Sequence, residues 1–151
     1  MLQEELDFSY DSKVVYAKKF YVKESATGNI VSSPEAVYKE MKEISETDQE
    51  SLWVITVNTK NKIIAKDLVG LGGIDFASVD PKILFRRILL NNGASFFIVH
   101  NHPSGEVEPS NEDKKLTDTL NKLADMLGLR FLDHLIIGDH GYFSFRKEGL
   151  I

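Results

Sequence analysis

Two histidines stand two positions apart after a short apolar run, and a serine and an aspartate follow within a few residues. The run covers residues 94–99, and after it come His100, His102, Ser110 and Asp113. Because alternate residues of a strand point to the same side, both imidazoles can reach one point in space. Neutral imidazole is a common zinc ligand. The spacing therefore predicts a metal site at the end of a buried strand.

Ser110 and Asp113 also have a simpler interpretation. Ser110 precedes an apolar-periodic segment, so it is the predicted N-cap of a helix, with Asp113 in the first turn. Capping alone explains this pair most simply, and it is compatible with metal binding because Asp113 then faces back toward the strand end. Three protein ligands with a fourth position left to water are typical of catalytic zinc sites. The chain has no cysteine that would close such a site with thiolates.

The order His-x-His, seven residues, Ser, two residues, Asp resembles the metal-site motif of the JAB/MPN (JAMM) metalloprotease family. The segments HNHPSG, EPSNED and LGLRFLDHLIIGD are most similar to its bacterial RadC-like branch, and the resemblance covers residues 32–145. It implies that His100, His102 and Asp113 bind Zn²⁺ and that Ser110 hydrogen-bonds the attacking water or the developing oxyanion. RadC proteins carry a helical region before this domain, which we expect this chain to lack.

Hydrolysis at such a site also needs a group that accepts a proton from water and passes it to the leaving amine. In the family this is a glutamate on an early strand, and the resemblance assigns it to Glu50, at the start of a predicted strand over residues 50–58. Glu40, Glu43 and Glu46 are nearby competitors. A solvated glutamate at a strand edge is the alternative interpretation of Glu50.

The remaining pattern predicts the elements that position these residues. A helix begins at Pro34 with Ser33 as its cap, a second begins at Asp80-Pro81, and a third covers residues 111–127. Strands are predicted over residues 50–58, 63–69, 94–99 and 129–137, and the glycine-rich residues 70–73 are a predicted turn. In the second helix the apolar stripe is formed by Ile83, Leu84, Ile88 and Leu89.

We therefore predict an α/β fold of the α+β type. The resemblance implies a cytidine-deaminase-like JAB/MPN architecture, in which a mixed, mainly antiparallel, curved sheet packs with two to three helices. The 151 residues suit one domain, large enough to bury about two thirds of its unfolded surface. We place this domain at residues 32–151. Residues 1–31 are predicted to be an N-terminal extension whose strand, over residues 13–23, joins the domain.

Composition narrows the function classes. A formal net charge of -5 gives no global attraction to nucleic acid or to an anionic membrane, although the basic pairs at 18–19 and 86–87 leave local contacts open. We find no apolar run of membrane-spanning length and no signal peptide, so we expect no membrane partner. The lack of cysteine is compatible with the cytoplasm, where we expect the protein to act.

The predicted function is zinc-dependent hydrolysis of an amide bond in a peptide or protein substrate, such as a ubiquitin-like protein. The alternative is a nucleic-acid-binding or nuclease role associated with DNA repair, and a non-catalytic binding module is a minor third possibility. Because histidine can bind metal ions, His134 is a possible further ligand, but the family motif does not use it as one. We interpret Asp133 and His134 as structural or supporting polar groups and His140 as exposed. The sequence predicts neither the individual substrate nor the oligomeric state.

Overall fold

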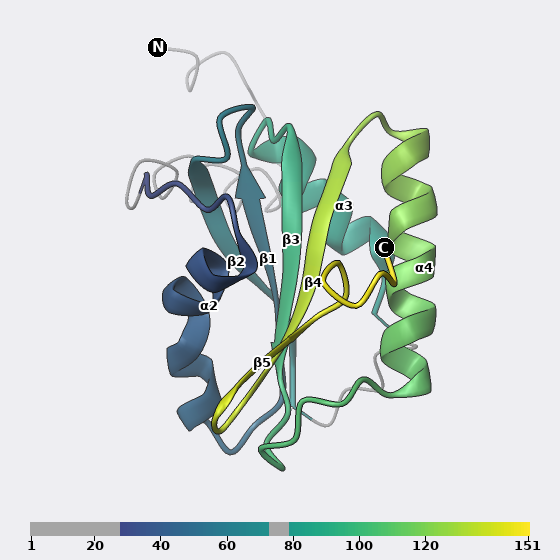
Figure 1. Ribbon diagram of the computed structural model, residues 1–151. Helices are drawn as coiled ribbons and strands as arrows, with labels where there is room; N and C mark the ends of the chain where they lie inside the picture. The colour runs from purple at the N-terminus through teal and green to yellow at the C-terminus, as the bar shows by residue number, and fades with distance from the viewer. Residues whose placement is uncertain (1–27, 73–78) are drawn as a thin grey trace, which may run out of the picture.

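The structure, a computed structural model, describes residues 28–72 and 79–151. The predicted N-terminal strand lies outside these residues, and the boundary at residue 31 stays a prediction. In chain order the described elements are α2 (Pro34–Met41), the short 3₁₀ helix η1 (Lys42–Glu46), β1 (Ser51–Val57), β2 (Ile63–Leu71), α3 (Pro81–Leu90), β3 (Ser95–Asn101), α4 (Asn111–Met126), β4 (Arg130–Gly138) and β5 (Gly141–Ser144) (Figure 1).

The described strands form one five-stranded sheet in the order β2-β1-β3-β4-β5. Neighbouring strands run antiparallel except β3 and β4, which are parallel. A parallel pair needs a long crossover, and α4 supplies it between these two strands. The prediction of a mixed, mainly antiparallel sheet packed with helices is confirmed.

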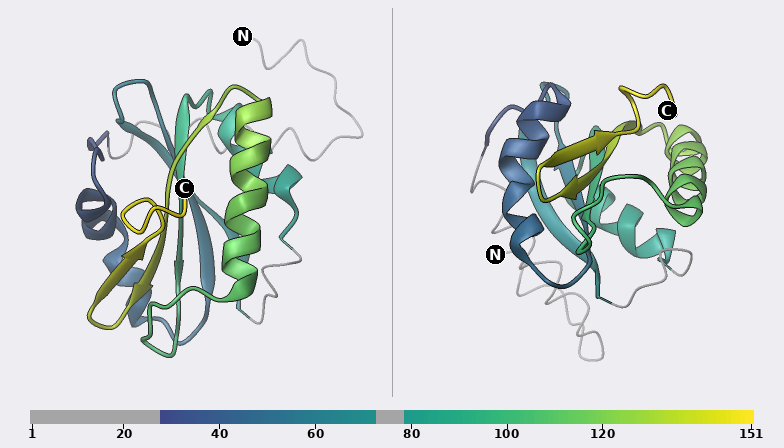
Figure 2. Two further views of the ribbon diagram at one scale, coloured as in Figure 1. Left: turned by 45° about the vertical axis from the view of Figure 1, so that its right-hand side comes forward. Right: turned by 60° about the horizontal axis from the view of Figure 1, so that its bottom comes forward.

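The sheet separates two apolar layers. Helices α3 and α4 cover one face and α2 covers the other (Figure 2). Successive residues of β3 alternate between them: Phe96 packs with Leu84 and Leu120, whereas Phe97 packs with Val37 on the α2 side. Because both faces are covered, every residue of β3 is buried, which explains why its sequence is a continuous apolar run rather than an alternating one.

The predicted helix starts are confirmed. Ser33 caps α2 by accepting a hydrogen bond from the main-chain N–H of Ala36 at 3.2 Å. Pro34 follows as the first helical residue, where its missing N–H costs nothing. Asp80 caps α3 in the same way. None of the helices within the described ranges is long and apolar enough to span a membrane.

Two local predictions are wrong. Leu84 and Ile88 of the α3 stripe are buried, but Ile83 and Leu89 are 41% and 55% exposed, and Phe85 takes their place in the core. The buried face of α3 is therefore rotated toward Phe85, whose ring packs edge-on against Phe96. The predicted turn at residues 70–73 also begins too early, because strand pairing between β2 and β1 continues through residue 71.

Candidate metal centre

The predicted site residues meet at one end of the sheet, the lower end in Figure 1. There β1 begins, β3 ends and α4 begins. His100 is the penultimate residue of β3 and is fully buried. The next residue beyond the strand is His102, with its side chain 17% exposed. The Nε2 atoms of the two rings are 3.0 Å apart, so the alternation of the strand brings both imidazoles to one point, as predicted.

Asp113 faces this point from the first turn of α4. Its main-chain N–H donates to Ser110 Oγ at 3.1 Å, and its own Oδ2 accepts from the main-chain N–H of Ser110 at 2.8 Å. This capping box fixes the carboxylate on the inner side of the helix. Oδ1 then lies 3.4 Å from His100 Nε2, and Oδ2 lies 3.4 Å from His102 Nε2. The capping interpretation of Ser110 and Asp113 is confirmed, and metal binding by Asp113 stays a prediction.

Glu50 reaches the same place from the residue before β1. One ligand atom each from Glu50, His100 and His102 lie within 4.8 Å of one another, a spacing that suits a shared metal ion. Two carboxylates, those of Glu50 and Asp113, therefore approach the imidazole pair from different elements. Asp113 is the predicted ligand and Glu50 the predicted acid/base, and both assignments stay predictions.

The pKa values of the two histidines and two carboxylates at this point are shifted in different directions. Burial lowers the pKa of His100, whereas the Asp113 carboxylate beside it raises the pKa of His102. Burial alone would raise the pKa of Asp113, but the two imidazoles beside it lower that pKa well below its usual range. Burial raises the pKa of Glu50 despite the attraction of His102. Asp113 is thus the better anion and Glu50 the better proton acceptor.

One unsatisfied atom of the site, together with the ring nitrogens beside it, fits a metal cation. Asp113 Oδ1 is buried and has no hydrogen-bond partner among the described residues. His102 Nδ1 lies 2.9 Å from the main-chain oxygen of Glu106. A carbonyl oxygen can only accept, so Nδ1 carries a proton, and in the neutral ring Nε2 keeps its lone pair toward Asp113. Two ring nitrogens 3.0 Å apart beside a buried carboxylate are a donor set that a divalent metal ion can satisfy in place of a proton.

The Ser110 hydroxyl remains at the surface of this site. Its oxygen accepts the capping bond from Asp113, which leaves the hydroxyl proton for donation to another group. The predicted contact with water or an oxyanion stays a prediction.

Asn101, between the two histidines, is a residue whose role the sequence analysis missed. Its Oδ1 accepts from both the N–H and the hydroxyl of Ser51, each at 2.8 Å. Its Nδ2 donates to the main-chain oxygen of Gln49 at 2.9 Å. The buried amide therefore holds both neighbours of Glu50 against β3. A polar residue in the middle of the His-x-His motif, on the opposite side of the strand, was the available signal.

Asp133 and His134 take different places behind the site. His134 is fully buried, and its Nε2 lies 2.8 Å from His100 Nδ1, on the side of that ring turned away from His102. Burial lowers the pKa of His134 well below its usual range, so it is a neutral imidazole. Asp133 points to the other face of β4, where it accepts from Arg146 N at 2.9 Å and from the Ser144 hydroxyl. The prediction that His140 is exposed is confirmed.

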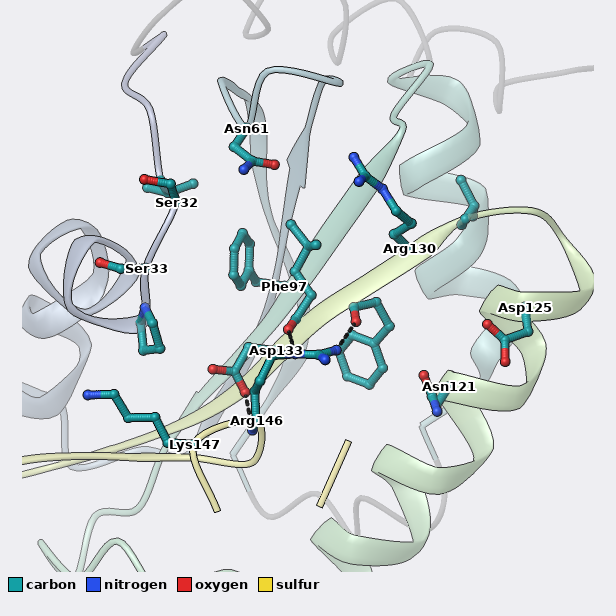
Figure 3. A pocket seen from close by; sticks show the side chains of 15 residues that line it. Ser32, Ser33, Asn61, Phe97, Asn121, Asp125, Arg130, Asp133, Arg146 and Lys147 are labelled. Carbon is teal, nitrogen blue, oxygen red and sulfur yellow. Dashed lines mark hydrogen bonds between the residues drawn. The ribbon is translucent and has the colours of Figure 1, made fainter. Parts of the chain in front are cut away.

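A hollow of about 560 Å³ lies elsewhere along β4. Figure 3 shows it between the start of α2, the Asn61 turn and α4, with Arg146 crossing its floor beside Asp133. The Arg146 guanidinium is occupied by the main-chain oxygens of Leu132 and Phe131, at 2.6 and 3.0 Å. None of the four residues of the metal centre lines this hollow, so it is separate from the candidate site.

Comparison with known proteins identifies relatives of the chain. The sequence pattern of the RadC-like JAB domain matches residues 31–150. A UPF0758 protein of Pelodictyon phaeoclathratiforme is 42% identical over 108 residues, which are 72% of this chain and 49% of that protein. A UPF0758 protein of Desulforudis audaxviator is 39% identical over 110 residues, 73% of this chain and 48% of that protein. The chain thus spans about half the length of these curated relatives, whose names state no activity.

Proposed function

The chain belongs to the RadC-like JAB domain family, and we propose that it is a zinc-dependent hydrolase that cleaves amide bonds. His100, His102 and Asp113 would hold the ion. The observation that carries this proposal is the buried Oδ1 of Asp113, which has no hydrogen-bond partner in the described chain and lies 3.4 Å from His100 Nε2. Nitrogen and carboxylate donors without sulfur suit zinc in a catalytic rather than a structural setting.

Zinc, when bound, would lower the pKa of water to about 7 and polarise the scissile carbonyl. Glu50 accepts the proton that water loses as it attacks the carbonyl carbon, and it delivers that proton to the leaving amine. Its raised pKa, caused by burial, favours both transfers. Ser110 donates its hydroxyl proton to the oxygen on which negative charge develops. The products are one carboxylate and one amine.

Peptides and proteins are the proposed substrate class, and a ubiquitin-like protein is one candidate within it. The side chain of His102 is partly exposed, and its neighbours Pro103 and Ser104 are exposed as well. The reacting groups are therefore accessible at the end of the sheet, which favours a substrate that is itself a chain over a small molecule enclosed in a cavity. The cytoplasmic location expected above stays a prediction.

The test is hydrolysis of a mixed peptide library by zinc-loaded wild type, Glu50→Gln, His102→Ala and Glu43→Gln. Glu50→Gln should lower the rate by about 10²–10⁴-fold while zinc stays bound, because the acid/base is lost. His102→Ala should lose both zinc and activity. Glu43→Gln is the matched control, since Glu43 is exposed on η1.

Full activity in Glu50→Gln would contradict the assigned acid/base. If the wild type bound zinc stoichiometrically but cleaved no peptide, isopeptide or nucleic acid, the hydrolase proposal would be wrong. The non-catalytic binding module would then be the favoured function. Cleavage of nucleic acid alone would favour the DNA-repair alternative.

A further inference from the structure

A chain of hydrogen bonds runs behind the metal centre and joins two of its proposed ligands through the core. His100 Nδ1 lies 2.8 Å from His134 Nε2, and His134 Nδ1 lies 2.7 Å from Thr117 Oγ1. Thr117 Oγ1 in turn lies 2.7 Å from the main-chain oxygen of Asp113, one turn earlier in α4. All four residues are buried. The chain therefore starts on one proposed ligand, Asp113, and ends on another, His100.

The direction of these bonds can be derived from the carbonyl at one end. The Asp113 main-chain oxygen can only accept, so the Thr117 hydroxyl donates to it; without that proton two oxygens would face each other at 2.7 Å. Thr117 Oγ1 must then accept from His134, which carries its proton on Nδ1. His134 is fully buried and its ring nitrogens face an imidazole and a hydroxyl rather than a carboxylate, so its ring is neutral, with one donor and one acceptor. His134 Nε2 therefore accepts from His100 Nδ1. His100 consequently keeps a lone pair on Nε2.

That lone pair is the one the metal centre requires. His100 Nε2 is the atom that faces His102 Nε2 at 3.0 Å and Asp113 Oδ1 at 3.4 Å. His102 obtains the same tautomer directly from a carbonyl, that of Glu106. His100 lies in the interior of the sheet and obtains it through Thr117 and His134 instead.

We propose that Thr117 and His134 are positioning residues that hold His100 in its metal-binding tautomer and thereby set the metal affinity of the site. Groups that fix a ligating imidazole from behind typically contribute about 10–100-fold to metal affinity. The proposal rests on the metal site proposed above, but it concerns residues that do not touch the ion.

A purely structural role for the two residues predicts something different. His134 stacks on Phe145, with ring centroids 4.6 Å apart, and Thr117 fills space in the core. If packing were their only contribution, an isosteric replacement of the Thr117 hydroxyl by a methyl group would leave the histidine tautomers and the zinc affinity unchanged.

Thr117→Val, Thr117→Ser and Thr56→Val test the proposal together. Thr117→Val removes the relay at constant shape, and Thr117→Ser restores its hydroxyl. The control is Thr56→Val, because Thr56 is equally buried on β1 and its hydroxyl has no hydrogen-bond partner within the described ranges. Zinc affinity is measured by competition with a chromogenic chelator, and folding is checked by thermal unfolding of the zinc-free proteins.

Thr117→Val should weaken zinc binding by about 10–100-fold, whereas Thr117→Ser and Thr56→Val should bind as wild type does. Long-range ¹H–¹⁵N spectra of histidine-labelled protein, with and without zinc, should show His134 and His100 protonated on Nδ1 in the wild type. The chain has four histidines, so the signals are assigned by single substitution. His134→Phe, which keeps a ring beside Phe145, should weaken zinc binding as Thr117→Val does.

Unchanged zinc affinity in a folded Thr117→Val protein would overturn the relay, as would a proton on His134 Nε2 in the wild type. These outcomes differ from failure of the proposed function. A wild type that binds zinc through His100 but hydrolyses nothing would end the hydrolase proposal and leave the relay standing, whereas a wild type that binds no zinc would remove the site on which both depend.

Discussion

Asp113 and Asp133 are both almost completely buried, yet their surroundings are opposite. Asp133 accepts bonds from the main-chain N–H groups of His134 and Arg146 and from the Ser144 hydroxyl. Asp113 accepts one bond, from the N–H of Ser110, and its Oδ1 faces His100 without a hydrogen-bond partner in the residues described. A buried carboxylate that the protein satisfies joins elements together. One that it leaves unsatisfied beside two imidazoles is prepared for a cation.

The largest effect is expected on zinc affinity, which should depend on Asp113 and not on Asp133. Asp113→Ala should weaken zinc binding by more than roughly 100-fold, because loss of a ligand exceeds loss of its supporting partners. The zinc-free variant should stay within about 1–2 kcal/mol of wild type, because the Ser110 cap remains and only the return bond of the capping box is lost. A chelator competition measures the affinity and denaturant unfolding the stability. Zinc retained in Asp113→Ala and lost in Glu50→Gln would exchange the roles of the two carboxylates.

Asp133→Ala should show the reverse pattern. It leaves buried donors without an acceptor, at about 1–3 kcal/mol each, so the free energy of unfolding should fall with or without zinc. The change in zinc affinity should be much smaller than in Asp113→Ala. Asp125→Ala, at an exposed position of α4, is the control. If the free energy of unfolding were unchanged in Asp133→Ala, the structural role of Asp133 would be wrong.

Asn101→Ala tests how precisely Glu50 must be held. The substitution releases the backbone on both sides of Glu50, and displacement of a reacting group by about 1 Å can cost 10²-fold in rate. We expect turnover of the zinc-loaded enzyme to fall while zinc affinity is kept. Ser51→Ala removes a single contact with Asn101 and should have a smaller effect. Equal turnover in Asn101→Ala and wild type would show that the amide does not position Glu50.

The smallest effect is expected at an exposed carboxylate. Hydrogen bonds from Lys147 and Tyr142 lower the pKa of Glu35 to about 2. A carboxylate whose pKa is lower in the folded than in the unfolded protein stabilises the fold at pH values above its unfolded pKa, about 4.3. This stabilisation is lost as the pH falls toward 2. The difference in melting temperature between wild type and Glu35→Gln should therefore shrink over this range. Because Glu35 is exposed, the difference should be small even at neutral pH; a large one would mean that burial does not separate structural from surface carboxylates.

The local parts of this molecule could be predicted from its sequence. Caps such as Ser33 and Ser110 depend on residues three positions away, and the shared direction of His100 and His102 follows from the geometry of one strand. The capping pattern also turned Asp113 back toward the strand end, whereas the place of Glu50 came from the family resemblance. The resemblance identified the site residues, but it did not predict the hydrogen bonds that support them.

The supporting contacts depend on strand pairing between distant segments. Asn101 reaches Ser51 because β3 pairs with β1, fifty residues earlier in the chain. His134 reaches His100 because β3 and β4 are parallel neighbours in one particular register. A shift of one residue would turn His134 to the other face of the sheet, and periodicity within a single segment does not contain this information.

Zinc-edge anomalous diffraction from a crystal of the zinc-loaded protein tests the central claim most directly. We predict one strong peak per chain, within bonding distance of His100 Nε2, His102 Nε2 and a carboxylate oxygen of Asp113. No peak at this end of the sheet, or one confined to a surface position such as the exposed His140, would contradict the account.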